Sequence, residues 1–126
     1  MTVKHALKWA DSVRPNQLTT EMKLSFLSEL EGLVRTEIMY KGPDETPRYG
    51  DAASEDTASE DTASEEALSA PPPYDNLYGW YLCAMIDLVQ GNTELYANDK
   101  AVFGKAYADF ARWYQRTNGG MRLGKL

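Results

Sequence analysis

The sequence predicts a small all-α protein, a bundle of about four helices with a long acidic loop between the second and third helices. Three observations lead to this prediction. Four segments carry apolar residues at the three-to-four-residue spacing of one helix face. Thr, Gly and Pro residues stand where these helices would begin and end. The 126 residues suffice for one hydrophobic core but not for two, so we expect a single domain, residues 1–126.

The first two helices are expected on either side of Pro15. Residues 2–13 have apolar side chains at helical spacing, and Thr2 suits the N-cap position because its hydroxyl can accept from a free backbone N–H. The second helix is expected to begin near Thr19 or Thr20 and to reach Ile38. A Gly-Pro pair at 42–43 then ends the pattern.

An acidic insert, residues 51–66, separates the second helix from the third. It repeats SEDTA twice from residue 54 to 63, begins a third copy at Ser64, and contains no large apolar side chain. Such a segment cannot bury enough surface to offset the entropy of ordering its backbone, so we expect a mobile, solvated loop or a poorly populated helix. Its flanks, residues 47–49 and 67–73, are expected to be extended or to form a short hairpin stem.

The third helix, residues 75–90, is apolar nearly all round. Six residues form a core-type stripe: Leu77, Trp80, Tyr81, Ala84, Met85 and Leu88. The opposite side carries Leu82, Ile86 and Val89. A helix of this kind is either enclosed by its own bundle or covered by another molecule. Both interpretations stay open, and under the second these three residues are candidate contacts between copies or with a partner.

The fourth helix, about residues 93–117, combines an aromatic face with a basic one. The aromatic face carries Tyr96, Phe103, Tyr107, Phe110 and Tyr114. Arg112 and Arg116 lie on the other face, and glycines at 119 and 120 are expected to end the helix and leave a flexible tail, residues 118–126. With Arg122 and Lys125 of that tail, the two arginines form a candidate partner surface; a plain solvated face is the alternative.

Catalytic chemistry has little support in the residue types. His5 is the sole histidine and Cys83 the sole cysteine, and the latter stands between apolar neighbours that would not lower a thiol pKa. Glu29 and Glu31 are two residues apart and point to different sides of their helix, and the acidic repeat has carboxylates but no rigid scaffold to hold them. We therefore expect a protein that is not an enzyme, with no catalytic, cofactor-binding or metal-binding residues and no cofactor.

The net charge of −6 belongs mainly to the insert and its flank. Residues 44–66 hold nine acidic residues and one base, which leaves 13 − 1 = 12 bases and 19 − 9 = 10 acids elsewhere. A nearly neutral remainder argues against tight binding to a nucleic acid backbone. One cysteine is typical of a reducing compartment, and without an apolar run of ~18 residues we expect neither a membrane span nor a signal peptide.

A family resemblance extends this interpretation. The segments TVKHALKWADSVRPNQL, LSELEGLVRTEI and PPPYDNLYGWYLCAMIDLVQGNTELYANDKAVFGKAYADFARWYQR resemble small proteins encoded beside the capsid genes of tailed bacteriophages and prophages of Gram-positive bacteria, grouped with head-tail connector (head-completion) proteins. Residues 73–87 and 96–98 carry most of the similarity, and the acidic insert departs from it. These are packing and turn residues, so the resemblance transfers no catalytic position.

The resemblance implies a helical bundle that acts as a structural assembly protein of the head-tail junction. Copies would form a homo-oligomeric ring beneath the portal, in contact with portal and tail-side proteins, and DNA would be only passing cargo. The location would be the virion, or the host cytoplasm during assembly. The alternative is a non-catalytic cytoplasmic interaction module or assembly chaperone whose acidic loop contacts a basic partner.

Overall fold

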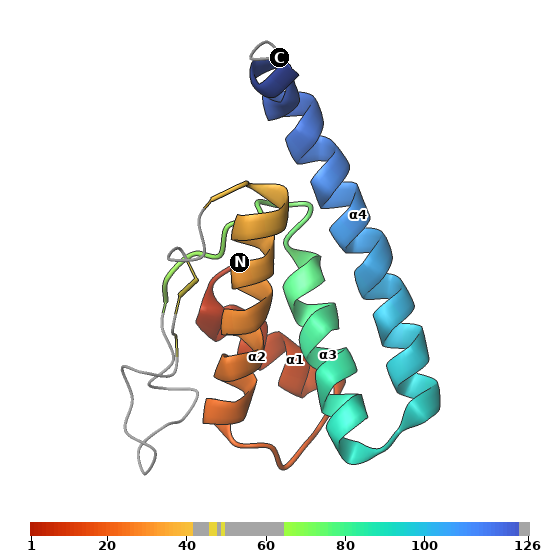
Figure 1. Ribbon diagram of the computed structural model, residues 1–126. Coiled ribbons are helices and arrows are strands. Elements are labelled where there is room, and N and C mark those ends of the chain that lie inside the picture. The colour runs from red at the N-terminus through yellow and green to blue at the C-terminus, as the bar shows by residue number, and fades with distance from the viewer. Residues whose placement is uncertain (42–45, 48, 50–64, 124–126) are drawn as a thin grey trace.

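A computed structural model confirms the all-α bundle. It describes residues 1–41, 46, 47, 49 and 65–123, with the side chains of the last helix described as far as Asn118. This part of the chain forms α1 (Val3–Val13), α2 (Thr20–Leu33), the π-helical segment η1 (Val34–Ile38), α3 (Asn76–Gln90) and α4 (Thr93–Leu123). In Figure 1, α2, α3 and α4 run up, down and up, and α1 crosses behind them. The central helix, α3, contacts α1, α2 and α4.

Local capping signals set the helix ends as the sequence predicts. The Thr2 hydroxyl accepts a hydrogen bond from His5 N at 3.1 Å, and the Thr19 hydroxyl accepts one from Met22 N at 3.1 Å. Each bond satisfies an N–H that the first turn of a helix leaves without a partner. Gly91 ends α3 with φ of 77°, a left-handed conformation that glycine adopts without steric cost.

The end of α4 differs from the prediction. The helix continues to Leu123, so residues 118–123 are helical rather than part of a flexible tail, while residues 124–126 lie outside the described part. Glycine in a helix costs only about 1 kcal/mol relative to alanine, which two residues do not make prohibitive. Thr117 and Asn118 also donate side-chain hydrogen bonds at 3.0 Å to the carbonyls of Trp113 and Tyr114 in the turn before.

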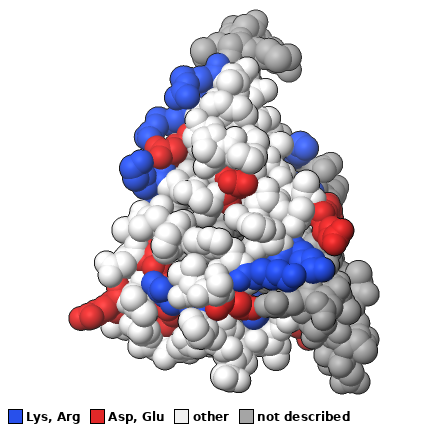
Figure 2. Space-filling view, turned by 180° about the vertical axis from the view of Figure 1, so that it is seen from behind, with Lys and Arg blue, Asp and Glu red and all other residues white. Residues whose placement is uncertain are grey.

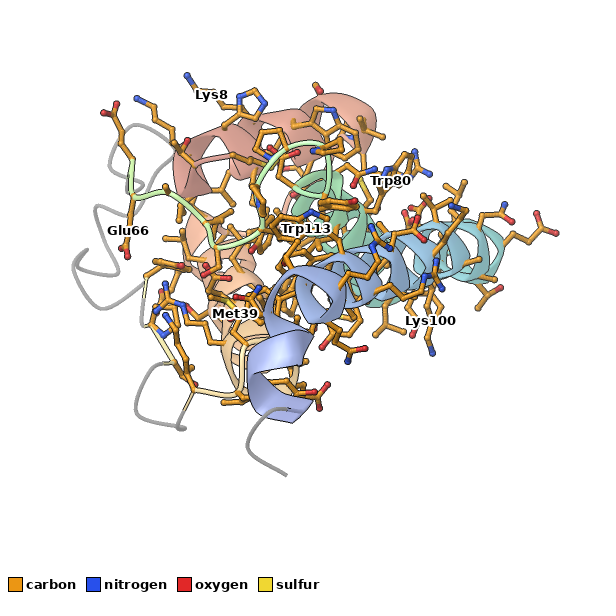
Figure 3. The ribbon with its side chains drawn as sticks, turned by 90° about the horizontal axis from the view of Figure 1, so that it is seen from above. Lys8, Met39, Glu66, Trp80, Lys100 and Trp113 are labelled. Atoms are coloured by element: carbon orange, nitrogen blue, oxygen red, sulfur yellow. The ribbon has the colours of Figure 1, made fainter. Side chains whose placement is uncertain are left out.

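The core forms around α3. Its fully buried large side chains come from all the helices and include Leu7, Leu27, Leu30, Val34, Leu77, Tyr78, Leu82, Ile86 and Phe110. Aromatic pairs join neighbouring helices: Trp9 and Trp80 meet edge to face with ring centroids 5.2 Å apart. Figure 3 looks down on the bundle and shows Trp113 of α4 lying toward its centre. The aromatic richness of the sequence is thus used largely for packing between helices.

The two flanks of the acidic insert are held by the helical body. Tyr49 is buried and donates its backbone N–H to the Ser28 hydroxyl at 3.1 Å. On the other side, Leu68 N donates to Met1 O at 2.9 Å and Val3 N donates to Glu66 O at 3.1 Å. The second flank therefore pairs with the N-terminal segment. The expected loop conformation of the SEDTA repeat, residues 54–64, lies outside the described residues.

Candidate functional site

The candidate contacts on α3 are divided by the fold. Leu82 and Ile86 are fully buried within the protomer, so they are core residues and the interface hypothesis is wrong for both. The reason is that α1 and α2 pack on the side of α3 opposite α4 and cover its second apolar stripe. Val89 remains 51% exposed at the end of the helix.

The exposed apolar edge at the end of α3 consists of Leu88 and Val89. Leu88, expected in the core, is 52% exposed because the last turn of α3 extends past the helices that enclose it. Val102, on the neighbouring helix α4, is 42% exposed. Two adjacent aliphatic side chains with half their surface in water form the kind of small patch that a partner can cover.

The basic face predicted on α4 is exposed and partly neutralised. Figure 2 shows basic side chains along the upper part of α4, interrupted by an acidic one. Lys105 donates to Asp109 at 2.9 Å, and Arg112 bonds the other oxygen of the same carboxylate. Hydrogen bonds from both cations hold the pKa of Asp109 below its ordinary value. Arg116 is exposed one turn further on.

The remaining two members of that predicted surface are less defined. Arg122 lies in the last turn of α4, but its side chain is not among those described. Lys125 lies outside the described residues. The structure therefore places Arg112 and Arg116 together on one exposed helix face. The end of α3, where Val89 lies, is at the opposite end of the α3–α4 pair from the last turns of α4 (Figure 1).

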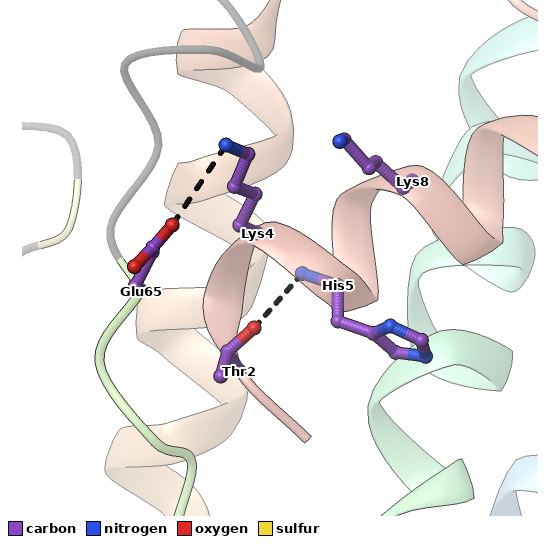
Figure 4. A pocket seen from close by; sticks show the side chains of 5 residues that line it. All are labelled: Thr2, Lys4, His5, Lys8 and Glu65. Carbon is purple, nitrogen blue, oxygen red and sulfur yellow. Dashed lines mark hydrogen bonds and ion pairs between the residues drawn. The ribbon is translucent and has the colours of Figure 1, made fainter.

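His5 lines a shallow surface hollow of about 440 Å³ together with Thr2, Lys4, Lys8 and Glu65. Figure 4 shows the imidazole directed away from Lys4 and Glu65, whose charged groups pair at 3.9 Å. The hollow is rich in positive charge but open to solvent, where such charges attract anions only weakly. Neither serine nor cysteine is among the side chains that line the hollow with His5.

Cys83 is fully buried in α3. Burial, together with the negative charge of nearby Asp99, raises the pKa of its thiol to about 12. A thiol with this pKa is almost entirely protonated at neutral pH and is a poor nucleophile. Its position agrees with the structural role that its apolar neighbours in the sequence indicate.

One buried polar cluster is centred on Glu31 of α2, which is fully buried. Tyr78 donates its hydroxyl to Glu31 Oε1 at 2.9 Å, and Ser69 N donates to Oε2 at 2.8 Å. Arg35 lies 3.6 Å from the same carboxylate. Burial, reinforced by the carboxylate charge, raises the pKa of Tyr78 well above its ordinary value, so the tyrosine stays a hydrogen-bond donor.

A second polar cluster joins Arg14, Asp87 and Asp99. The guanidinium donates to Asp87 Oδ2 at 3.3 Å and to Asp99 Oδ1 at 2.9 Å. Both carboxylates are nearly inaccessible, with 1% and 3% of their side-chain surfaces exposed. The helical periodicity of the sequence did not reveal this cluster. Asp87, an acidic residue within the apolar sequence of α3, does indicate it, because a buried carboxylate needs a partner.

Two further observations concern metals and membranes. In the described residues, His, Cys, Asp and Glu side chains do not gather in threes that could bind a metal ion. Among the described helices, none combines the length and the apolarity that a membrane span requires.

Comparison of the chain with protein families, with curated proteins and with solved structures finds no match.

Proposed function

We propose that this chain is a non-catalytic assembly protein of the head-tail junction of a tailed bacteriophage, where copies form a ring beneath the portal. The resemblance of residues 73–87 and 96–98 to connector proteins motivates the proposal. In the fold these residues organise packing: Tyr74 lies 5.4 Å from Trp113 and 6.1 Å from Phe110, ring centroid to centroid. A subunit that serves as a structural part needs such a rigid body more than it needs a reactive site.

The observation that carries the proposal is a pair of different exposed surfaces at opposite ends of the molecule. The lower one is the apolar edge of Leu88 and Val89. The upper one is the projecting part of α4, whose 31 residues span about 46 Å, against about 22 Å for the 15 residues of α3. Figure 1 shows its last turns rising beyond the rest of the bundle.

Unlike surfaces on one subunit are what a ring requires. A cyclic assembly larger than a dimer joins one patch of each copy to a different patch of the next, whereas a two-fold dimer uses the same patch twice. Here an apolar edge and a projecting helix with Arg112 and Arg116 are available for such a contact. The near-neutral charge outside the acidic insert suits a conduit through which DNA passes without tight binding.

The test is self-association, measured by native mass spectrometry of the purified protein alone and with the portal of the same phage. We expect rings or portal-bound copies for the wild type, and loss of both for L88K/V89K. Lysines at the end of α3 favour the helix electrostatically, so this variant should keep its fold. The control is Gln90→Lys, which adds one positive charge, against two in L88K/V89K, at an exposed neighbouring position and should assemble normally.

A wild type that stays monomeric at all concentrations and does not bind the portal would contradict the proposal. If L88K/V89K still assembles, the apolar edge is not part of the contact between subunits. Circular dichroism of both variants distinguishes a lost contact from a lost fold, because unfolding of an all-helical protein abolishes its far-ultraviolet helix signal.

A second candidate function follows from the anchored flanks of the acidic insert. Tyr49 and Leu68, on its two sides, are both buried against the helical body, so the acidic residues between them start and end at fixed points. Such a segment can present negative charge to a basic partner, as an interaction module or assembly chaperone would. Loss of partner binding on removal of the acidic residues, with the bundle intact, would favour this alternative over the ring.

A further inference from the structure

The cluster of Arg14, Asp87 and Asp99 ties three elements together. Arg14 follows the last turn of α1, Asp87 lies near the end of α3, and Asp99 lies near the start of α4. The two ion pairs bridge separations of 73 and 85 residues along the chain. Through Arg14, this cluster joins the end of α1 to both α3 and α4.

The charges in the cluster do not balance. Two carboxylates share one guanidinium, and Asp87 Oδ1 and Asp99 Oδ2 are buried without a hydrogen-bond partner in the described part of the chain. The two carboxyl groups also lie within hydrogen-bonding reach of each other. A buried acceptor without a donor is costly, and two negative carboxylates in contact repel each other. One added proton would relieve both problems.

Neighbouring groups on every packed element leave this imbalance in place. Asp11 of α1 and Lys23 of α2 pair with each other at 2.8 Å. Cys83 of α3 stays neutral because its pKa is raised. Within the described residues, Arg14 is therefore the cation that contacts the carboxylate pair.

We propose that Asp87 and Asp99 hold a single shared proton, and that this proton, together with Arg14, locks α4 against α1 and α3 until it is lost at higher pH. Burial, followed by the hydrogen bond with Asp87, raises the pKa of Asp99 from 3.8 to about 6. This pH-dependent lock does not depend on the proposed assembly of copies into a ring.

The sign of the pH effect follows from this shift. A carboxyl whose folded-state pKa is raised binds its proton more tightly in the folded state than in the unfolded state. Its contribution to stability is complete below the unfolded pKa and is lost as the pH rises through about 6. As the pH rises from 4.5 to 7.5, we expect loss of this proton to lower the folding equilibrium constant by roughly thirtyfold.

The decisive variant is Asp99→Asn. Its amide carbonyl can still accept from Arg14 and its NH₂ group can donate to Asp87, so it imitates the protonated pair at every pH. Urea unfolding of wild type and D99N at pH 4.5 and 7.5 gives the ratio of their folding constants. We expect that ratio to shift by roughly thirtyfold in favour of D99N at the higher pH. The matched control, Asp109→Asn on the exposed face of α4, should change the ratio little.

A direct measurement covers the case in which D99N does not fold. The carboxyl carbons of the wild type can be titrated by ¹³C NMR, and that of Asp99 should change with a midpoint near pH 6. Amide exchange in the first turns of α4, corrected for its intrinsic pH dependence, should become faster above this midpoint. A midpoint below pH 4.5 for Asp99, or a D99N ratio that is the same at both pH values, would overturn the proposal.

Discussion

Glu31 shows at the scale of one residue how a buried charge organises this fold. Its carboxylate accepts from Tyr78 of α3 and from the backbone of Ser69, and it lies beside Arg35 of η1. The same side chain therefore positions α2, α3 and the segment that leads from the acidic insert back to the bundle. A helical wheel places Glu31 on α2 but cannot show that its partners lie 47 and 38 residues away.

We predict that Glu31→Ala destabilises the protein by about 3–5 kcal/mol, because it leaves a buried hydroxyl and a buried N–H without their acceptor. Chemical denaturation measures the change in the free energy of unfolding. Glu21→Ala, at an exposed position in the first turn of the same helix, should cost less than about 1 kcal/mol. Equal losses in the two variants would contradict this account of the cluster.

At the scale of elements, the contact between α1 and α3 depends on a glycine. A Cβ atom added at Gly79 would overlap the six-membered ring of Trp9, so the absence of a side chain allows α1 to approach α3 closely. Trp9 then packs edge to face on Trp80. The sequence shows a glycine in the middle of a helix, which is unfavourable by itself, and the packing supplies the reason for it.

Gly79→Ala should therefore destabilise the protein by about 1–2 kcal/mol, since the steric overlap outweighs the gain in helix propensity. Thermal unfolding, together with near-ultraviolet circular dichroism of the tryptophans, measures this change. Gly104→Ala is the matched control, because a Cβ at this position of α4 meets no atom within 4 Å. It should stabilise the helix by about 0.5–1 kcal/mol, and a loss of stability there would contradict the explanation.

Helix boundaries show the same division between local and distant causes. The caps at Thr2, Thr19 and Gly91 act within one turn, and the sequence predicted the first of them and placed the second helix start near Thr19 or Thr20, as observed. The continuation of α4 beyond Thr117 was missed because glycine weakens a helix without forbidding it.

At the scale of the whole molecule, we expect residues 51–64 of the acidic insert to be separable from the bundle. The contacts that hold its flanks involve Tyr49, Glu66 and Leu68, all outside residues 51–64. Those residues carry five acids, so replacing them by neutral residues changes the formal net charge from −6 to −6 + 5 = −1. Charge and stability can therefore be varied independently in this protein.

Replacing residues 51–64 by a Gly/Ser segment of equal length should leave the melting temperature within about 2 °C of the wild-type value, because loop length and flank contacts are kept. Differential scanning calorimetry measures the change. A drop beyond about 5 °C would mean that the acidic residues contact the bundle, contrary to expectation. Native mass spectrometry of the same variant shows whether ring formation requires the acidic residues of the insert.

The sequence by itself determined the class of the fold, the number of main helices, their starts and the single core, because caps and apolar periodicity act over a few residues. It also marked α3 as the helix with apolar residues on all sides. Only the tertiary structure decided that Leu82 and Ile86 face inward while Leu88 and Val89 face water. It alone brought Arg14 to Asp87 and Asp99, since such contacts depend on how helices dock and not on spacing within any one of them.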